Sequence, residues 1–235
     1  KNIPSISPTY WNIFFNIDTG LLSQQDQLTS PSQQQQTSTN IDKTIRFFLD
    51  QGFSKEAVAG IVGNWQQESG GNLNPSLINP GREGLSYNDS TQTYAAGIAQ
   101  WVGSRRVNLL KLAKAQGVNI DRYDDAVKIK DNATKTPNSF TILRSAFVNI
   151  PIETQLDFSL KEMKLIGGFT AFKVSTDIRF TTDWIHSKYE GNPDASNPAA
   201  YNKRFINANE ILKYILSEKY KLSVVYTTNL NLFTK

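Results

Sequence analysis

The 235-residue sequence contains no cysteine and only one histidine, His186. Without cysteine, a thiol nucleophile and a disulfide-stabilised scaffold are both excluded. A single imidazole excludes a histidine-rich zinc site. A Ser-His-Asp triad would have to use His186, and no Gly-x-Ser-x-Gly turn accompanies it. Carboxylates are therefore the main side chains left for acid–base chemistry. We expect His186 itself to be a partly buried surface histidine on a helix.

Long apolar runs are also missing. None approaches the roughly 18–20 residues of a transmembrane helix, so we expect no membrane span. Residues 3–22 hold scattered apolar side chains, but Pro, Asn and Asp interrupt them, unlike a signal peptide or an amphipathic anchor. The chain begins with Lys instead of Met, so we expect a processed protein or part of a longer one.

Charge and glycine pattern exclude further classes of function. The net charge of +4 is modest, and the basic residues do not alternate with aromatic ones as on nucleic-acid-binding surfaces. No glycine-rich phosphate loop stands between a strand and a helix. We therefore expect no nucleic-acid partner, no metal and no cofactor.

Glu68 lies at the end of a helical stripe of apolar residues. Val58, Ile61, Val62 and Trp65 have the spacing of one buried helix face, and Glu68 falls on the same face. Desolvation at the edge of the core raises the pKa of a carboxyl group. A carboxylic acid still protonated near neutral pH can donate a proton to a leaving group. Glu68 is therefore the candidate general acid; the alternative is a helix-terminal glutamate turned to solvent.

Four sequence blocks occur in a fixed order. They are residues 59–64 leading into Gln67-Glu68-Ser69, then Gly97-Ile98-Ala99-Gln100-Trp101 with Ser104-Arg105-Arg106, then Gln155-Leu156-Asp157-Phe158, and Tyr189-Glu190-Gly191-Asn192-Pro193. This set resembles the phage tail lysozyme domain of the lysozyme-like superfamily of peptidoglycan hydrolases. Glu-Ser-Gly followed by Gly-Ile-Ala-Gln is also similar to goose-type lysozymes and soluble lytic transglycosylases. The resemblance covers about residues 40–216.

The resemblance implies roles for individual residues. Glu68 matches the general acid of the family. Gln100 matches a glutamine that lines the sugar groove, and its amide can both donate to and accept from an N-acetyl group. Trp101 and Tyr94 could contact the sugar or fill the core, which is the more common fate of a tryptophan.

The other expected site residues are polar. Ser69 is expected to cap or support the site and not to act as a nucleophile, and Glu190 to have a structural or binding role close to the groove. A retaining glycosidase needs two carboxyls about 5–5.5 Å apart, and an inverting one needs them about 6.5–9.5 Å apart. Glu83 and Asp89, in the loop after Glu68, are the candidates for a second carboxylate. The similar goose-type lysozymes and transglycosylases work largely with one glutamate, so a single-carboxylate mechanism is the alternative.

The sequence divides into three parts. Residues 1–40 are expected to form an extended arm, with a Gln/Ser/Thr-rich linker over residues 24–40 that cannot bury a core. The aromatic cluster within residues 9–22 could dock on the same chain or on another protein. Residues 41–216 are expected to form the lysozyme-like peptidoglycan hydrolase domain, and residues 217–235 a C-terminal tail with a short strand-like segment.

The domain is predicted to be mainly α-helical, a lysozyme-like fold with a small β element over residues 84–101. Helices are expected at residues 41–49, 54–68, 104–116, 152–166, 169–189 with a break near Thr181, and 198–216. Ser54 and Ser104 are the expected N-caps. Gly60 and Gly63 weaken the second helix, so we expect them to permit the close approach of another backbone. Residues 121–150 exceed the usual family link and are expected to be a surface insertion with a helical turn at 142–147.

Together the motifs and the resemblance predict a phage-tail-associated muramidase. It would cleave the β-1,4 bond between N-acetylmuramic acid and N-acetylglucosamine (MurNAc and GlcNAc) of bacterial peptidoglycan when the phage genome enters the cell. Residues 1–40 and 217–235 would attach it to other tail proteins in the virion. The alternatives are a lytic transglycosylase of the same fold and an inactive structural or glycan-binding tail protein.

Overall fold

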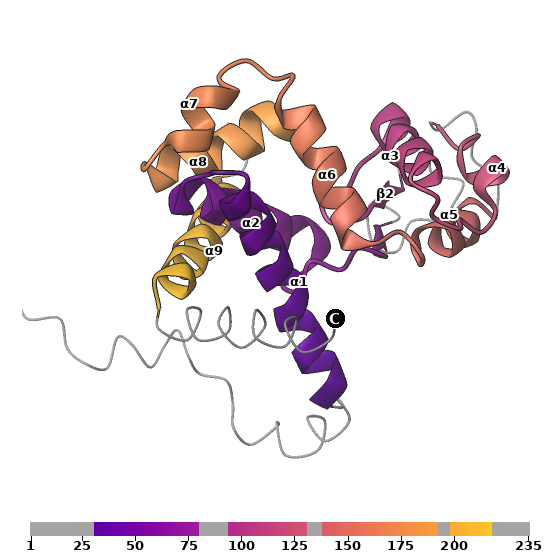
Figure 1. The fold of residues 1–235 in the computed structure, drawn as a ribbon, viewed down its shortest axis with the longest axis horizontal. Coiled ribbons are helices and arrows are strands. Elements are labelled where there is room, and N and C mark those ends of the chain that lie inside the picture. The colour runs from indigo at the N-terminus through magenta and orange to yellow at the C-terminus, as the bar shows by residue number, and fades with distance from the viewer. Residues whose placement is uncertain (1–30, 80–93, 131–137, 192–197, 218–235) are drawn as a thin grey trace, which may run out of the picture. The chain divides into compact units, whose positions relative to one another are not determined.

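The computed structural model describes residues 31–79, 94–130, 138–191 and 198–217 (Figure 1). The chain divides into two units, residues 1–36 and 37–235, and the site lies in the second. The fold is mainly helical with a small two-stranded sheet, which confirms the predicted fold class. The elements in chain order are α1 (Pro31–Asp50), α2 (Lys55–Ser69), β1 (Ile78–Asn79), β2 (Ala95–Ala96), α3 (Gly103–Ala115), α4 (Tyr123–Ala126), α5 (Ser139–Phe147), α6 (Ile152–Met163), α7 (Phe169–Val174), α8 (Ile178–Trp184), the π-helical turn η4 (Ile185–Tyr189) and α9 (Pro198–Leu216).

Helix α6 stands between two groups of elements. In Figure 1, α2, α7, α8 and α9 lie together on one side of α6, and α3, α4, α5 and the sheet lie on the other. Contacts of α2 with α8, α9 and η4 build the first group, and contacts of α5 with α4 and β1 build the second. The functional candidates at the end of α2 and around β2 therefore belong to different groups, with α6 placed between them.

Helix α2 begins and packs as the sequence predicts. Ser54 is its N-cap, and the Ser54 hydroxyl accepts a hydrogen bond from the backbone N–H of Ala57 at 3.0 Å. The same hydroxyl donates to the carbonyl of Ser175, which fastens the start of α2 to the segment after α7. The predicted apolar face is completely buried. Its members are Val58, Ile61, Val62 and Trp65.

The two glycines of α2 lie against other backbones, as predicted. A Cβ on Gly63 would lie 2.5 Å from the nitrogen of Ala208 and 2.6 Å from its Cα, and a Cβ on Gly60 would lie 2.9 Å from the carbonyl carbon of Thr181. The buried amide of Asn64 donates to the carbonyl of Thr182 at 3.1 Å. Helix α2 is therefore pressed onto α8 and α9 at a distance that only residues without a side chain permit.

The sheet is short and antiparallel. Ile78 pairs with Ala96, and Asn79 pairs with Ala95. Strand β2 lies inside the predicted β region, whereas β1 precedes it, and residues 84–93 lie outside the described residues. Beyond β2 the chain turns back on itself, because Ala96 and Trp101 exchange two backbone hydrogen bonds of 3.0 and 2.9 Å. This turn carries Gln100.

Three predicted helix boundaries were wrong. Helix α1 begins at Pro31 and not at residue 41, so residues 31–40 are helical instead of an extended linker. Proline suits the first turn of a helix, glutamine is a good helix former, and neither glycine nor proline interrupts residues 32–40. Helix α3 begins at Gly103 with Val102 as its N-cap, so Ser104 does not cap it. Helix α6 ends at Met163, before the predicted end at residue 166.

The predicted long helix over residues 169–189 is broken earlier than Thr181. Its interruption is at residues 175–177, where the Asp177 carboxylate accepts hydrogen bonds from the N–H groups of Arg179 and Phe180 at 2.9 and 3.1 Å and starts α8. Helix α9 has the predicted bounds. The segment 121–150 contributes Leu143 and Phe147 of α5 to the core, so it is more than a surface insertion.

The contact at Gly63 generates a test of the fold. We expect Gly63→Ala to lower the free energy of unfolding by about 2 kcal/mol, because the added methyl meets the backbone of α9, which cannot rotate away. Alanine is favoured over glycine in a helix by about 1 kcal/mol, which is too small to offset this clash. Gly167→Ala is the control, since no atom lies within 4 Å of its added Cβ. Urea denaturation that finds the two variants equally stable would contradict the close packing of α2 on α9.

Candidate active site

The carboxyl group of Glu68 lies at the C-terminal end of α2, with 26% of its side chain exposed. Its Oε1 accepts a hydrogen bond from Nη2 of Arg204 on α9. Burial raises the pKa of Glu68, the negative charge of Glu190 raises it further, and Arg204 acts in the opposite direction without reversing the shift. Glu68 therefore has the environment that its place on the apolar stripe predicted, and it keeps a proton to higher pH than an ordinary glutamate.

Glu190 and His186 are the other two titratable groups whose charges act on Glu68. Oε2 of Glu190 lies 3.7 Å from Nε of Arg204 and 3.2 Å from Nδ1 of His186. The side chains of Glu190, Arg204 and His186 are 8%, 7% and 1% exposed. His186 is therefore fully buried and not a partly buried surface residue, because η4 packs against α2. Glu190 shares Arg204 with the candidate acid and is held by protein groups, so its expected place close to the sugar groove stays a prediction.

Gln100 is held by its own turn. Its backbone has a positive φ of 48°, a strained conformation for a residue other than glycine. Its Nε2 donates to the carbonyl of Gly97 at 2.8 Å. Its Oε1 is buried and has no hydrogen-bond partner among the described residues. That oxygen is therefore a free acceptor within the part of the chain that is described.

Trp101 is a core residue. Its ring is fully buried and meets Phe158 edge-on with ring centroids 5.6 Å apart. Its Nε1 donates to Oε2 of Glu162 at 3.0 Å and to the hydroxyl of Tyr189 at 3.1 Å. The structure thus places Trp101 in the second of its two expected settings, away from a sugar face.

Tyr94 and Ser69 are also enclosed by protein. The ring of Tyr94 is buried beside Phe140, and its carbonyl accepts a hydrogen bond from the buried guanidinium of Arg106. Burial lowers the pKa of Arg106 to about 10. The Ser69 hydroxyl is buried and donates to the carbonyl of Trp65 at 2.9 Å. The Ser69 hydroxyl is therefore used within the last turn of α2 in this geometry.

A second polar cluster ties α3, α6 and η4 together. Arg105 donates two hydrogen bonds of 2.8 Å to the two oxygens of Glu162, and a third of 3.2 Å to the carbonyl of Tyr189. The Tyr189 hydroxyl donates to Glu162 at 2.9 Å, and the Arg105 guanidinium lies 4.6 Å from the Tyr189 ring centre. Because Tyr189 precedes Glu190, this cluster fixes the backbone from which Glu190 extends.

Gln155 holds the turn that carries Gln100. Its buried Oε1 accepts from the backbone N–H of Ile98 at 3.0 Å, and its Nε2 donates to the carbonyl of Pro75 at 2.8 Å. A Cβ on Gly97, which has a φ of 76°, would lie 2.5 Å from that oxygen. One amide of α6 therefore fixes both the turn after β2 and the segment that comes after Glu68.

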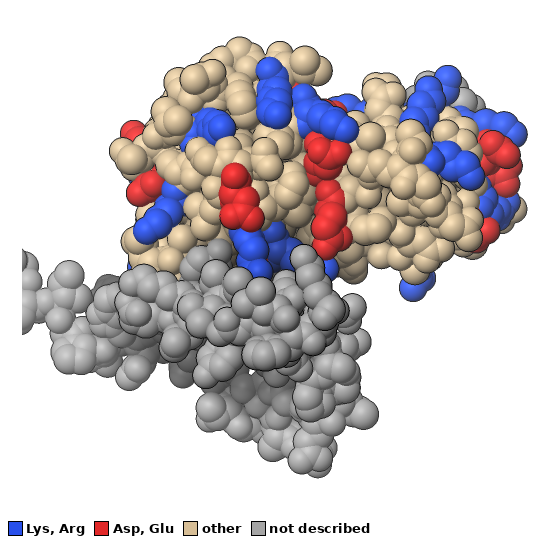
Figure 2. All heavy atoms as spheres, viewed as in Figure 1, with Lys and Arg blue, Asp and Glu red and all other residues tan. Residues whose placement is uncertain are grey.

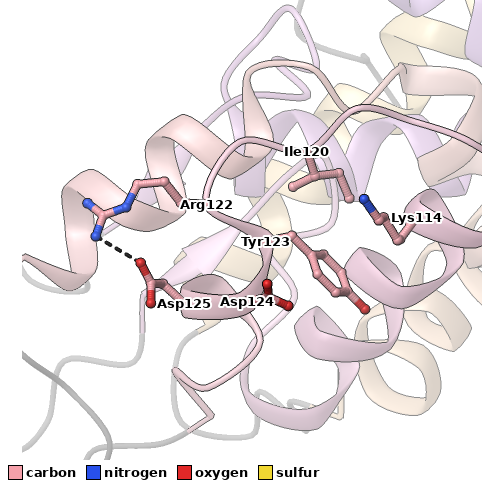
Figure 3. A pocket seen from close by; sticks show the side chains of 6 residues that line it. All are labelled: Lys114, Ile120, Arg122, Tyr123, Asp124 and Asp125. Atoms are coloured by element: carbon pink, nitrogen blue, oxygen red, sulfur yellow. Dashed lines mark hydrogen bonds and ion pairs between the residues drawn. The ribbon is translucent and has the colours of Figure 1, made fainter.

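Glu83 and Asp89 lie outside the described residues, so their proposed role as a second carboxylate stays a prediction. Among the described residues, no group of three His, Asp or Glu side chains is arranged to hold a metal ion. A cavity of about 470 Å³ lies beside α3 and α4, and none of its lining residues is a candidate site residue (Figure 3). It is lined by Lys114, Ile120, Arg122, Tyr123, Asp124 and Asp125.

Arg204 was missed by sequence reasoning. The apolar spacing of α9 predicts one face made of Tyr201, Phe205, Ala208, Leu212 and Ile215. Ala208 and Ile215 are buried, but Arg204 and Ile211 complete the buried face in place of the other three. An arginine in register with a buried stripe is the signal that could have identified it, since buried charges in proteins are paired.

Charges of both signs are interspersed on the face of the described residues drawn in Figure 2. None of the helices within the described ranges is both long and apolar enough to cross a membrane. Neither finding distinguishes one kind of binding partner from another. The functional conclusion therefore has to come from the cluster around Glu68.

Comparison with known proteins supplies the family. No curated protein matches the sequence. The family model described as phage tail lysozyme matches residues 39–215, a span that contains the candidate residues from Glu68 to Arg204 and nearly all of α9. Membership indicates a peptidoglycan-degrading activity of the lysozyme type and an association with the phage tail. The ordered sequence blocks, the helical fold with its small sheet and this match agree, and the chain belongs to the phage tail lysozyme family.

Proposed function

We propose that this chain is a muramidase that cleaves the β-1,4 bond between MurNAc and GlcNAc in peptidoglycan, with Glu68 as the general acid. The observation that carries the proposal is the setting of the Glu68 carboxyl. It lies at a helix end, mostly covered but with 26% of the side chain open, and its pKa is raised by burial. A proton donor to a glycosidic oxygen needs this combination of retained proton and access.

In the proposed reaction, Glu68 transfers its proton to the glycosidic oxygen while the bond between that oxygen and C1 of the muramic residue breaks. The bonding electron pair stays on the oxygen, and positive charge develops at C1 and the ring oxygen. Glu68 is left as a carboxylate, which Arg204 stabilises more strongly than it stabilises the neutral acid. General acid catalysis of this kind contributes about 10²–10⁴ in rate.

Gln100 is the proposed ligand of the substrate N-acetyl group. Its buried Oε1 is free of partners among the described residues, while its Nε2 is used by the turn. The amide oxygen accepts from the N–H of an acetamido group. Trp101, Tyr94 and Ser69 are proposed to support the site without touching the substrate, because each is buried and hydrogen-bonded within the protein.

The protein is proposed to act from the virion when the phage genome enters the cell. Residues 1–40 and 217–235 lie almost entirely outside the family match at 39–215, and we propose that they attach the enzyme to other tail proteins. The peptidoglycan substrate follows from the family, whereas these attachment segments are a proposal from sequence position.

The alternative is a lytic transglycosylase of the same fold. The observation that favours it concerns Glu190, the carboxylate that shares Arg204 with Glu68. Glu190 is 8% exposed and is engaged by His186 and Arg204, which makes it unsuited to activate an attacking water. In a transglycosylase the C6 hydroxyl of the muramic residue attacks C1, and no water is consumed.

We expect Glu68→Gln to reduce cell-wall solubilisation by about 10²–10⁴-fold while the protein remains folded, because the amide keeps the shape and removes the transferable proton. The measurement is the initial rate of clearing of purified cell walls, with thermal unfolding monitored by circular dichroism. Glu56→Gln, at the other end of the same helix, is the control and should keep the wild-type rate. A Glu68→Gln variant that clears cell walls normally would refute the assignment. A wild-type protein that binds cell walls without clearing them would indicate a glycan-binding protein.

The reaction product distinguishes hydrolysis from transglycosylation. We expect reducing muramic acid ends, since Glu83 or Asp89 in the loop after Glu68 is proposed to position a water. Mass spectrometry of digested cell wall is the measurement, because a 1,6-anhydro end is lighter by one water molecule. Predominantly anhydro ends would establish the transglycosylase alternative and leave Glu83 and Asp89 without a catalytic role.

The catalytic domain should function without the first unit of the chain. We expect a variant beginning at Thr37 to clear cell walls at the wild-type rate, since the buried residues of α1, Ile45 and Phe48 among them, come after that position. A variant beginning at Gly52 lacks these core residues and should lose its cooperative thermal transition. Loss of folding on removal of residues 1–36 alone would show instead that this segment belongs to the domain.

A further inference from the structure

Glu68 and Glu190 share one guanidinium. Arg204 donates to Oε1 of Glu68 through Nη2, and its Nε lies 3.7 Å from Oε2 of Glu190. The cluster holds two carboxyl groups, one permanent positive charge and the imidazole of His186, which lies 3.2 Å from Oε2 of Glu190, in a place with little water. Uncompensated buried charge is costly, so uptake of one proton by the cluster is favoured.

The groups that face Glu68 decide where this proton resides. They are Arg204 on α9, Glu190 at the end of η4 and His186 on η4. Oε2 of Glu190 lies 3.2 Å from Nδ1 of His186 and 3.7 Å from Nε of Arg204. Glu68 has Arg204 as its ionic partner and is more exposed, 26% against 8%. Burial and the charge of Glu190 raise the pKa of Glu68, so Glu68 is the carboxyl that retains a proton and can pass it to a substrate.

Arg204 also selects the oxygen that carries the proton. The hydrogen bond from Nη2 engages Oε1 of Glu68, so the acidic proton belongs on Oε2. The position of Arg204 is fixed in turn by the close crossing of α2 and α9, where Gly63 meets Ala208, one helical turn along α9. The orientation of the proton donor thus depends on a side chain that is 7% exposed.

We propose that Arg204 and Glu190 are positioning residues for Glu68. Arg204 fixes Oε1, and Glu190 draws part of the guanidinium charge away so that Glu68 stays protonated. This inference rests on the proposed function, in which Glu68 is the general acid. It assigns Glu190 a role in the charge balance behind the acid, in place of contact with sugar.

Glu190 and Arg204 shift the pKa of Glu68 in opposite directions, so their removal should shift the pH dependence of activity in opposite directions. Beyond the effect of burial, the charge of Glu190 raises the pKa of Glu68, whereas Arg204 and, to a smaller extent, His186 lower it. The acid must be protonated, so activity is lost as the pH rises through the pKa of Glu68. Removing the charge of Glu190 lowers this pKa and moves the alkaline limb of the pH–rate profile to lower pH. Removing the charge of Arg204 moves it to higher pH.

The experiment uses Glu190→Gln, Arg204→Met and Arg204→Lys in the full chain. The first two should move the alkaline limb of cell-wall clearing in opposite directions by about one pH unit, the scale of one neighbouring charge. Arg204→Lys should keep the limb and lower the maximal rate, because an ammonium lacks the fixed fork of donors. Glu210→Gln is the control, since Glu210 is on α9 but exposed and paired with Lys213. If Arg204→Met does not fold, Glu190→Gln and Arg204→Lys still carry the test.

A second measurement separates this inference from the proposed function. The ¹³C NMR titration of the Glu68 side-chain carboxyl, assigned by its loss in Glu68→Gln, reports the charge sharing without any substrate. A titration midpoint that falls in Glu190→Gln together with the limb supports the proposal. The proposal is overturned if neither Glu190→Gln nor Arg204→Met moves the titration midpoint of Glu68 or the alkaline limb of the pH–rate profile. A midpoint that moves while the limb stays fixed shows that Glu68 is not the acid, so the proposed function fails although the charge sharing holds.

Discussion

The closeness of α2 and α9 is the constraint on which the rest of the site depends. Gly63 lets the backbone of Ala208 approach, and further along the same crossing Glu68 meets Arg204. The two helices cross in opposite directions, because Gly63 meets Ala208 and the later Glu68 meets the earlier Arg204. The tight contact therefore sets the distance that the Arg204 guanidinium must span to reach Glu68. A wider crossing would remove the contact of the buried Arg204 with Glu68, and losing a partner is costly for a buried charge. Packing between two backbones is thus what makes a short charged contact possible at the edge of the core.

The local sequence predicts where helices begin and end better than it predicts which side chains meet between helices. The start of α2 at Ser54, its buried face and the bounds of α9 could be predicted, because caps, glycines and apolar spacing are properties of a short window. The start of α1 was missed because a glutamine-rich segment has no apolar period yet has good helix propensity. The pair of Glu68 and Arg204 is separated by 136 residues. No periodicity within one helix contains that contact, so the acid could be predicted and its counter-ion could not.

Aromatic residues show why the sequence could not separate core from sugar site. A tryptophan beside a groove motif can stack on a pyranose or fill the interior, and the choice depends on partners for its N–H. Here Glu162 and Tyr189 supply those partners, from elements far along the chain. The buried indole then serves as a support that connects the turn of Gln100 to η4. The same network explains how Arg105, part of a conspicuous sequence block, and Glu162, which no motif indicated, together hold the site.

The π-helical turn at Ile185–Tyr189 gives this part of the chain an unusual sensitivity to length. The N–H of Glu190 bonds to the carbonyl of Ile185, five residues back. Tyr189 thereby reaches the cluster on α3 and α6, while Glu190 faces Arg204. Loss of one residue here would return the backbone to α-helical spacing and rotate the residues beyond the deletion by about 100°. Such a deletion would keep every named side chain of the site and still uncouple its two halves, so among relatives this segment should vary in composition more readily than in residue count.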